Sequence, residues 1–130
     1  MDSTTIFEDA KKQGCIIKNN TFYPSITMQA KFIIESCISE LQRTDYISLT
    51  YIEGSVNEEV FKSYKKRRQS LRDEINFLEE KNTAELSVLN PLNADNQKFY
   101  DAGLELANDF CKHYNSLYSE LLATESAQDE

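Results

Sequence analysis

The residue types that most often carry out catalysis are sparse in this chain. His113 is the sole histidine, and Cys111 lies two positions before it. Residues at i and i+2 of a helix point to different faces, so these two side chains do not form a local cysteine–histidine nucleophilic pair. Asp109 and His113 are four residues apart and share a helix face, but no third nitrogen or thiolate ligand for a metal lies nearby. We therefore expect no catalytic residue and no metal site here, with His113 on a helix surface or at an interface.

Local motifs for phosphate, calcium or hydrolase chemistry are also missing from the sequence. There is no glycine-rich phosphate loop, no H-E-x-x-H and no G-x-S-x-G, and the run 95–97 lacks the Gly and the terminal Glu of a calcium loop. Cys15, Cys37 and Cys111 are widely spaced and form no C-x-x-C, which favours small apolar core residues over a disulfide framework or a zinc site. We expect a non-enzymatic protein without a cofactor.

The most distinctive charged feature is a group of six cations within eleven residues. They are Lys62, Lys65, Lys66, Arg67, Arg68 and Arg72. Spacings of three and four place Lys65, Arg68 and Arg72 on one helix face beside Tyr64, an arrangement able to meet successive phosphates of a nucleic acid. Acidic residues follow directly, and Glu58 stands four residues before Lys62 in the order that favours an ion pair. The competing interpretation is a solvated or partner-facing charged surface.

Composition and charge favour one small helical domain. The chain has 130 residues, with 14 Lys+Arg against 22 Asp+Glu and a net charge of −8. This length supports a single core, and only 3 Gly and 2 Pro leave little material for the many tight turns of an all-β fold. Residues 90–130 carry 2 basic and 8 acidic side chains, so the C-terminal third is expected to attract a basic partner. No run of 18 apolar residues and no secretory signal is found, which predicts no membrane span and a cytoplasmic or nuclear location.

Helix signals divide the N-terminal half of the chain. A short helix is expected from about Thr5 to Gln13, ended by Gly14 in a left-handed conformation. Residues 15–24 are expected to form an ordered loop, the alternative being a small hairpin around the Asn-Asn pair at 19–20. A second helix opens at 24–25 and continues past residue 41, because apolar residues recur at spacings of three and four. Residues 45–54 fit a strand or a helix, and we favour a helical continuation kinked near 43–45.

Two longer helices are predicted in the second half. Ser55 and Glu58 form a capping box, and the helix that starts there is expected to reach Leu89, before Asn90-Pro91. Its near-heptad seam consists of Phe61, Tyr64, Arg68, Leu71, Ile75, Leu78, Asn82, Leu86 and Leu89. The last helix is expected from about Asp95 to Leu122. It carries two adjacent apolar stripes, which predicts neighbours on more than one side.

The short connection at 90–94 predicts that these two helices are antiparallel neighbours. The expected facing pairs are Leu78 with Leu106, Ile75 with Phe110, Leu71 with His113 or Tyr114, Asn82 with Gly103, and Arg68 with Glu120. The resulting fold class is all-α, a small helical bundle built around a long antiparallel helical hairpin. Shorter N-terminal helices would pack on this hairpin to complete one domain over residues 1–122, followed by an acidic, frayed tail at 123–130.

These features predict a protein that acts through its surfaces. The chain has 7 Tyr, 7 Phe and no Trp, and amphipathic tyrosine rings are common at interfaces. The predicted partner-binding residues are Lys62, Lys65, Arg68, Arg72, Tyr100, Tyr114 and Tyr118. The long helix is basic before residue 73 and acidic after it, so two copies laid antiparallel would also oppose unlike charges and form a homodimer. We expect a protein–protein interaction subunit (an adaptor, inhibitor or assembly component), the alternative being a nucleic-acid-associated regulator that uses the basic helix.

Overall fold

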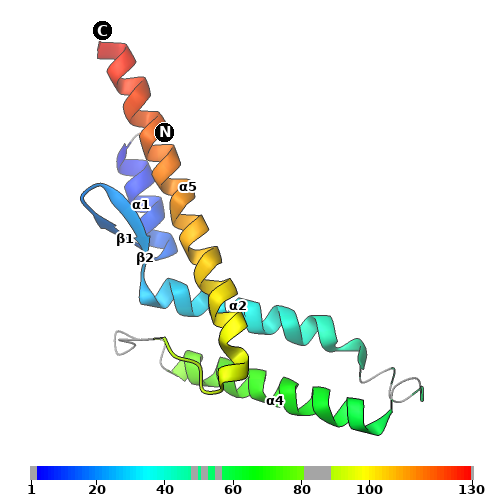
Figure 1. Cartoon of the computed structure of the whole chain (residues 1–130). Helices are drawn as coiled ribbons and strands as arrows, with labels where there is room; N and C mark the ends of the chain where they lie inside the picture. Colours follow the sequence, from blue (N-terminus) through cyan, green and yellow to red (C-terminus); the bar gives the residue numbers. More distant parts are fainter. Residues whose placement is uncertain (1–2, 48–49, 51–52, 55–56, 81–88, 130) are drawn as a thin grey trace.

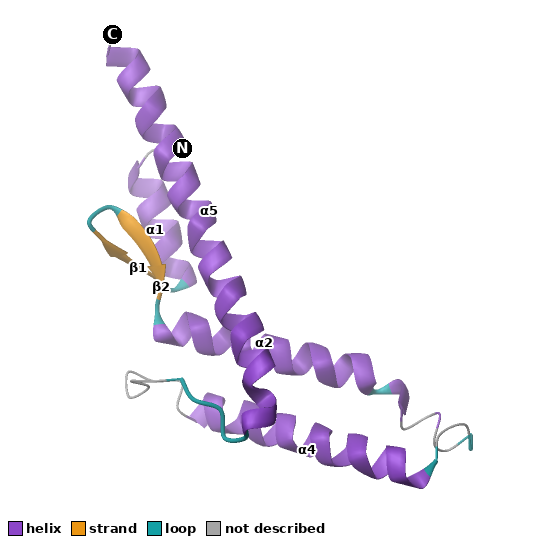
Figure 2. Ribbon diagram, in the orientation of Figure 1, coloured by secondary structure: helices purple, strands orange, loops and turns teal. Residues whose placement is uncertain are grey.

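The protein is mostly helical, with one small two-stranded sheet (Figures 1 and 2). A computed structural model describes residues 3–47, 50, 53–54, 57–80 and 89–129. The long C-terminal helix α5 (Gln97–Asp129) runs along one limb of the molecule, where helix α1 (Ser3–Gln13) and the sheet pack on it. The other limb holds helices α2 (Ile26–Thr44) and α4 (Glu58–Glu80), which lie side by side (Figure 1). The predicted all-α, bundle-like class is therefore confirmed in its coarse form.

The segment after α1 forms a hairpin where an ordered loop was expected. Gly14 ends α1 with a φ of 105°, as predicted. Strands β1 (Cys15–Lys18) and β2 (Thr21–Pro24) pair antiparallel around Asn19 and Asn20, which have φ values of 51° and 62°. Two left-handed residues are what the tightest hairpin turn requires, and Asn tolerates that conformation. Such short arms are stabilised here by packing on α5, so the loop prediction was wrong for a tertiary reason.

Helix starts follow local capping signals. Ser25 caps α2, and its Oγ accepts from the Met28 amide at 3.1 Å, as the predicted start implied. In α4 the side chain that caps is Asn57, whose Oδ1 accepts from the Val60 amide at 2.9 Å. The predicted capping box began at Ser55, which lies outside the described residues. Beyond α2, Asp45 is a turn and Tyr46 and Ile47 are helical again, which confirms the kinked continuation for the residues described.

The antiparallel hairpin predicted between α4 and α5 is not confirmed. α4 packs along α2, whereas α5 crosses α2 and extends away from α4 (Figure 1). Leu106 is 49% exposed where it was expected to face Leu78, and Phe110 packs in a different apolar cluster from Ile75. The physical reason lies in the connection, because its backbone and the 3₁₀ turn η1 (Ala94–Asn96) are hydrogen-bonded to the middle of α4. α5 therefore starts beside Glu74 and departs across α2.

Two apolar clusters hold the molecule together, and α2 and α5 contribute to both. The first joins α1, the sheet and the C-terminal part of α5, and it includes Phe22, Cys15 and Cys111. The second joins α2, α4 and the start of α5 around Ile33, Leu71 and Leu78. The cysteines are buried, as the sequence predicted. The position of α5 against several neighbours is also confirmed, although the helix continues to Asp129 and does not end near residue 122.

Candidate functional site

The cations of α4 divide between two sides of the helix. Lys62, Lys65, Lys66, Arg67 and Arg72 are exposed, and Arg68 is half-buried. A turn of an α-helix is 3.6 residues, so a run of adjacent cations necessarily spreads around the helix. On one side the side chains point into a small hollow toward residue 47, and on the other they line a larger cleft toward the start of α5. The basic segment therefore forms two distinct surfaces, where the sequence suggested one stripe.

The smaller hollow contains the three cations that were predicted to share a face. Lys65, Arg68 and Arg72 line a cavity of about 180 Å³ together with Ile47, Phe61 and Tyr64. Lys62 does not line it, and its Nζ lies 3.5 Å from Glu58 Oε1 in the predicted i, i+4 pair. Both partners of that pair are well exposed, so it contributes at most a few tenths of a kcal/mol, about 0.3–0.5 in such pairs.

Arg68 holds the end of α2. Its Nη1 donates to the Leu41 carbonyl oxygen and to Thr44 Oγ1, each at 2.6 Å, and Nη2 donates to Asp45. The side chain is only 12% exposed. The last carbonyls of a helix have no partner within the helix, so a guanidinium placed there satisfies them and complements the negative end of the helix dipole. The predicted pairing with Glu120 was wrong, and Arg68 acts as a structural contact between α4 and α2.

Replacing Arg68 with alanine is expected to lower the free energy of unfolding by about 2–3 kcal/mol, because charged hydrogen bonds to buried acceptors are lost. The buried Thr44 hydroxyl and the Leu41 carbonyl would lose their guanidinium donor. Lys65→Ala, one turn earlier and exposed, is the matched control and should change stability by less than about 0.5 kcal/mol. Urea unfolding followed by circular dichroism measures both. Equal effects of the two substitutions would show that Arg68 is merely a surface cation.

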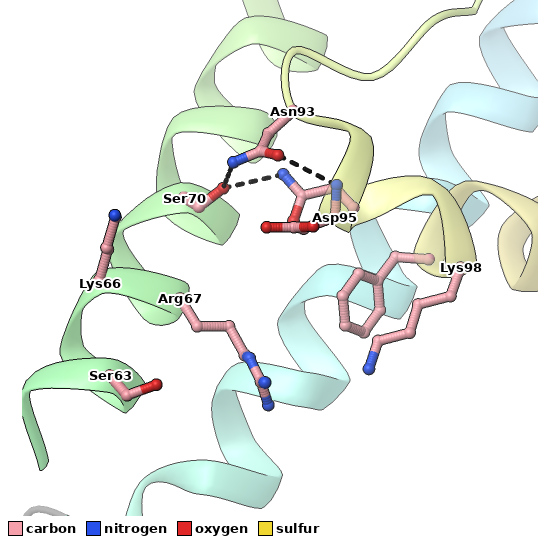
Figure 3. Close-up of a pocket in the computed structure, with 9 residues that line it drawn as sticks. Ser63, Lys66, Arg67, Ser70, Asn93, Asp95 and Lys98 are labelled. Carbon is pink, nitrogen blue, oxygen red and sulfur yellow. Dashed lines mark hydrogen bonds between the residues drawn. The ribbon is translucent and has the colours of Figure 1, made fainter. Parts of the chain in front are cut away.

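The larger cleft lies between α4 and the start of α5 and has a volume of about 400 Å³ (Figure 3). Its lining residues are Ser63, Lys66, Arg67 and Ser70 from α4, Asn93, Asp95 and Asn96 from the connection and η1, and Lys98 and Phe99 from α5. Three of these side chains are cationic and one is acidic. The cleft is therefore a local positive site in a chain whose net charge is −8.

A buried carboxylate below this cleft fixes the connection against α4. Glu74 is fully buried and accepts hydrogen bonds from the Leu92 amide (2.9 Å), Asn96 Nδ2 (3.0 Å) and the Tyr100 hydroxyl (2.8 Å). Burial and the hydrogen bond to Glu74 raise the pKa of Tyr100 above its ordinary value. Burial, together with the nearby Glu74 charge, raises the pKa of the Cys37 thiol to about 12. The Tyr100 hydroxyl therefore stays protonated at neutral pH and remains a donor to Glu74, and these hydrogen bonds join α4 to the connection and to the start of α5.

The predicted tyrosine surface is wrong for two of its three members. Tyr100 is fully buried, and Tyr114 is 5% exposed, with its hydroxyl donating to Asp9 Oδ2 at 2.6 Å. Tyr118 is half-buried, and its ring centroid lies 5.1 Å from that of Phe7. Apolar stripes on a helix indicate burial but do not say which partner covers them. Here α1 and the sheet cover Tyr114, whereas Tyr100 packs in the cluster formed with α2 and α4. Binding of a partner by Tyr118 stays a prediction.

The residues first considered for catalysis are not brought together. His113 is exposed, and the nearby carboxylate of Asp109 lies 3.8 Å from Lys112. Cys111 is buried, with its Sγ 3.2 Å from that of Cys15, and burial raises the pKa of both thiols, to about 12 for Cys15. Within the residues described, no group of three or more histidine, cysteine, aspartate and glutamate side chains is arranged to hold a metal ion.

Sequence reasoning identified the cations of α4 and missed the cleft that some of them form. Lys98 is thirty-one positions after Arg67, and the serines at 63 and 70 matched no motif. Spacing within α4 places Ser63, Lys66, Arg67 and Ser70 on neighbouring positions of one side, which was the available signal. The contribution of Lys98 depends on where α5 begins, and no local pattern encodes it.

In the described part of the chain, no helix is both long enough and apolar enough to span a lipid bilayer.

Comparisons with known proteins identify no relative. The chain matches no protein-family model, no curated protein and no solved structure at a significant level.

Proposed function

We propose that the chain is a non-enzymatic helical interaction subunit that binds an acidic segment of a partner protein through the exposed cations of α4. The observation that carries this proposal is that cations of α4 are exposed and not paired with carboxylates of the described residues. Lys65, Lys66, Arg67 and Arg72 are exposed on one helix, and among the described residues none of them has an ion-pair partner within 4.0 Å. An adaptor, an inhibitor and an assembly component would all use such a surface.

Electrostatic complementarity supports a protein partner more than a nucleic acid. Like charges on the rest of the molecule oppose a polyanion at long range, since the net charge is −8. A short acidic peptide carries fewer negative charges than a nucleic acid and meets less of this repulsion, and complementary charged surfaces mainly raise the association rate and the specificity of a complex. The nucleic-acid alternative keeps one observation in its favour, which is the exposure of Lys65 and Arg72 beside Tyr64 on a common face.

The test compares partner capture by the full-length wild-type chain and by the double variant Lys65→Glu, Arg72→Glu. A tagged chain is recovered from its native cells after nuclease treatment, and bound proteins are quantified. We expect a partner to be at least tenfold depleted with the variant, because two attractions become repulsions. The matched control is Lys12→Glu, Lys31→Glu, which reverses two exposed cations on other helices and should keep the partner. Equal recovery with all three proteins contradicts the proposal.

A salt series separates the nucleic-acid alternative. Binding to a generic DNA duplex and to single-stranded RNA is measured between low and physiological salt. Affinity that falls steeply with salt and is abolished by the α4 double variant favours the alternative, because each neutralised phosphate releases counterions. Absence of binding at low salt removes it. Concentration-dependent self-association that the same variant abolishes would identify the partner as a second copy of the chain.

A further inference from the structure

The cleft between α4 and α5 is lined by more positive than negative charge. Arg67 and Lys98 extend from opposite walls toward the same space, and Lys66 stands at the outer rim (Figure 3). In the described residues none of the three has a carboxylate within 4.0 Å. Arg67 lies 5.4 Å from the ring centroid of Tyr64, and Lys98 lies 5.0 Å from that of Phe99. These ring contacts orient the two cations and leave their charge available to a ligand.

A carboxylate of α2 that senses the cleft cations already has a cation of its own. Glu40 of α2 accepts two hydrogen bonds from Arg43, at 2.6 and 2.9 Å. This bidentate contact holds the pKa of Glu40 below its ordinary value, and the charges of Lys98 and Arg67 act in the same direction. Glu40 is thus neutralised mainly by a cation outside the larger cleft. Asp95 remains as the one carboxylate of the cleft lining, against three cations.

The hydroxyl of Ser70 adds a neutral donor to the cleft. Its Oγ accepts hydrogen bonds from Asn96 Nδ2 at 3.1 Å and from Asn93 Nδ2 at 3.5 Å (Figure 3). A serine hydroxyl has two acceptor lone pairs and one donor proton, so these two contacts use its acceptor capacity. The O–H proton is left to donate to a ligand oxygen. The second serine of the lining, Ser63, is exposed two turns earlier on the same side of α4.

A compact group with several oxygens and more than one negative charge fits this arrangement. A carboxylate carries one charge and two oxygens, whereas a phosphate monoester carries about −1.5 to −2 at neutral pH and three acceptor oxygens. Nucleic-acid phosphodiesters carry one charge each and are spread along a backbone, so they suit a row of cations better than a focal cluster. The cleft combines cations from two helices with serine hydroxyls from α4 around one space, which favours a single dianion.

We propose that this cleft binds the phosphate group of a phosphorylated serine, threonine or tyrosine side chain of the partner. This inference rests on the proposed function, which supplies the protein partner, and it adds the chemical group that the partner presents. It also assigns a different surface from the hollow tested by Lys65 and Arg72. The two proposals therefore predict that substitutions at different positions abolish binding, at 65 and 72 for the proposed function and at 67 and 98 for the phosphate site.

The test follows backbone amide signals by NMR in the full-length chain while O-phosphoserine or inorganic phosphate is added at constant ionic strength. We expect saturable shifts centred on Ser70, Asn96 and Lys98. The double variant Arg67→Gln, Lys98→Gln should weaken binding at least tenfold. Its matched control, Lys62→Gln, Lys65→Gln, removes the same charge from exposed positions outside the cleft and should keep affinity within twofold. An unchanged spectrum of the free variants away from the substitutions shows that folding is intact.

Three results would overturn this inference. They are no saturable shift at the cleft, equal weakening by the control variant, and tighter binding of a twelve-nucleotide single strand along the row from Lys62 to Arg72.

If an oligoglutamate peptide binds through Lys65 and Arg72 while phosphoserine does not bind, the cleft assignment fails and the proposed function stands. If phosphoserine binds at the cleft but no protein is lost on charge reversal of α4, the proposed function fails and the ligand is a free phosphate ester.

Discussion

Replacing Glu74 with alanine is expected to lower the free energy of unfolding by about 3–5 kcal/mol, which is a large share of the stability of a small domain. Glu74 is fully buried, and its two carboxylate oxygens accept from the Leu92 amide, Asn96 Nδ2 and the Tyr100 hydroxyl. Alanine would remove the acceptor shared by the Leu92 amide, Asn96 Nδ2 and the Tyr100 hydroxyl, and it would open a cavity between α4 and the start of α5. Urea unfolding followed by circular dichroism gives the change directly.

The conservative variant distinguishes the hydrogen-bond network from simple space filling. Glu74→Gln keeps one carbonyl oxygen for the Leu92 amide and Asn96, and its amide group can donate to the Tyr100 oxygen while that hydroxyl turns to the Asn90 carbonyl, now 3.4 Å away. We therefore expect this variant to lose less than half as much stability as alanine. Glu79→Ala, on the exposed side of the same helix, should have little effect. Similar losses for alanine at positions 74 and 79 would refute the role of the network.

Gly103→Ala should destabilise the protein by roughly 2 kcal/mol even though alanine is the better helix former. A Cβ at position 103 would lie 2.6 Å from both Cα and N of Ile33, which are backbone atoms of α2 and cannot rotate away. The crossing of α2 and α5 would have to widen, which would loosen the apolar cluster built around Ile33. The gain in helix propensity, about 1 kcal/mol, is smaller than the cost of this overpacking. Thermal unfolding of the variant and the wild type measures the difference.

A neighbouring position isolates the propensity effect. Ala102 is exposed on the same helix, so Ala102→Gly should cost about 1 kcal/mol through helix propensity alone. At Gly103 the same pair of residues is exchanged in the opposite direction, and propensity alone predicts stabilisation. A stabilised Gly103→Ala protein would mean that α2 and α5 do not approach each other closely in solution.

Local signals predicted several element boundaries correctly. The stop at Gly14 and the start of a helix at 24–25 were both predicted from the sequence, because the bonds that define such boundaries join residues a few positions apart. The near-heptad seam of α4 also marked buried positions correctly, since Leu71 and Leu78 are fully buried. What the seam could not contain was the identity of its partner. An apolar stripe accepts any complementary helix, and here α2 takes the place that α5 was expected to fill.

The hairpin at residues 15–24 shows a local signal that needed a distant contact. The Asn-Asn turn was visible, but its arms were too short to be stable alone. The side chain of Asn115 on α5 accepts from the Phe22 amide at 2.8 Å and donates to the Phe22 carbonyl oxygen at 3.1 Å. This side chain bonds the backbone of β2 much as a neighbouring strand would. Residues ninety-three positions apart make the contact, and no window on the sequence contains both.

The candidate site likewise has features that the sequence predicts and features that tertiary packing decides. The cations of α4 and their approximate faces follow from helical spacing, which is a property of the chain itself. The structural role of Arg68, the burial of Glu74 within an acidic run and the arrival of Lys98 at the cleft were decided by tertiary packing. Charge patterns report what a side chain carries, whereas burial and partners depend on which elements pack together. That choice is made by long-range contacts, and the connection bonded to Glu74 is the one that directs α5 across α2.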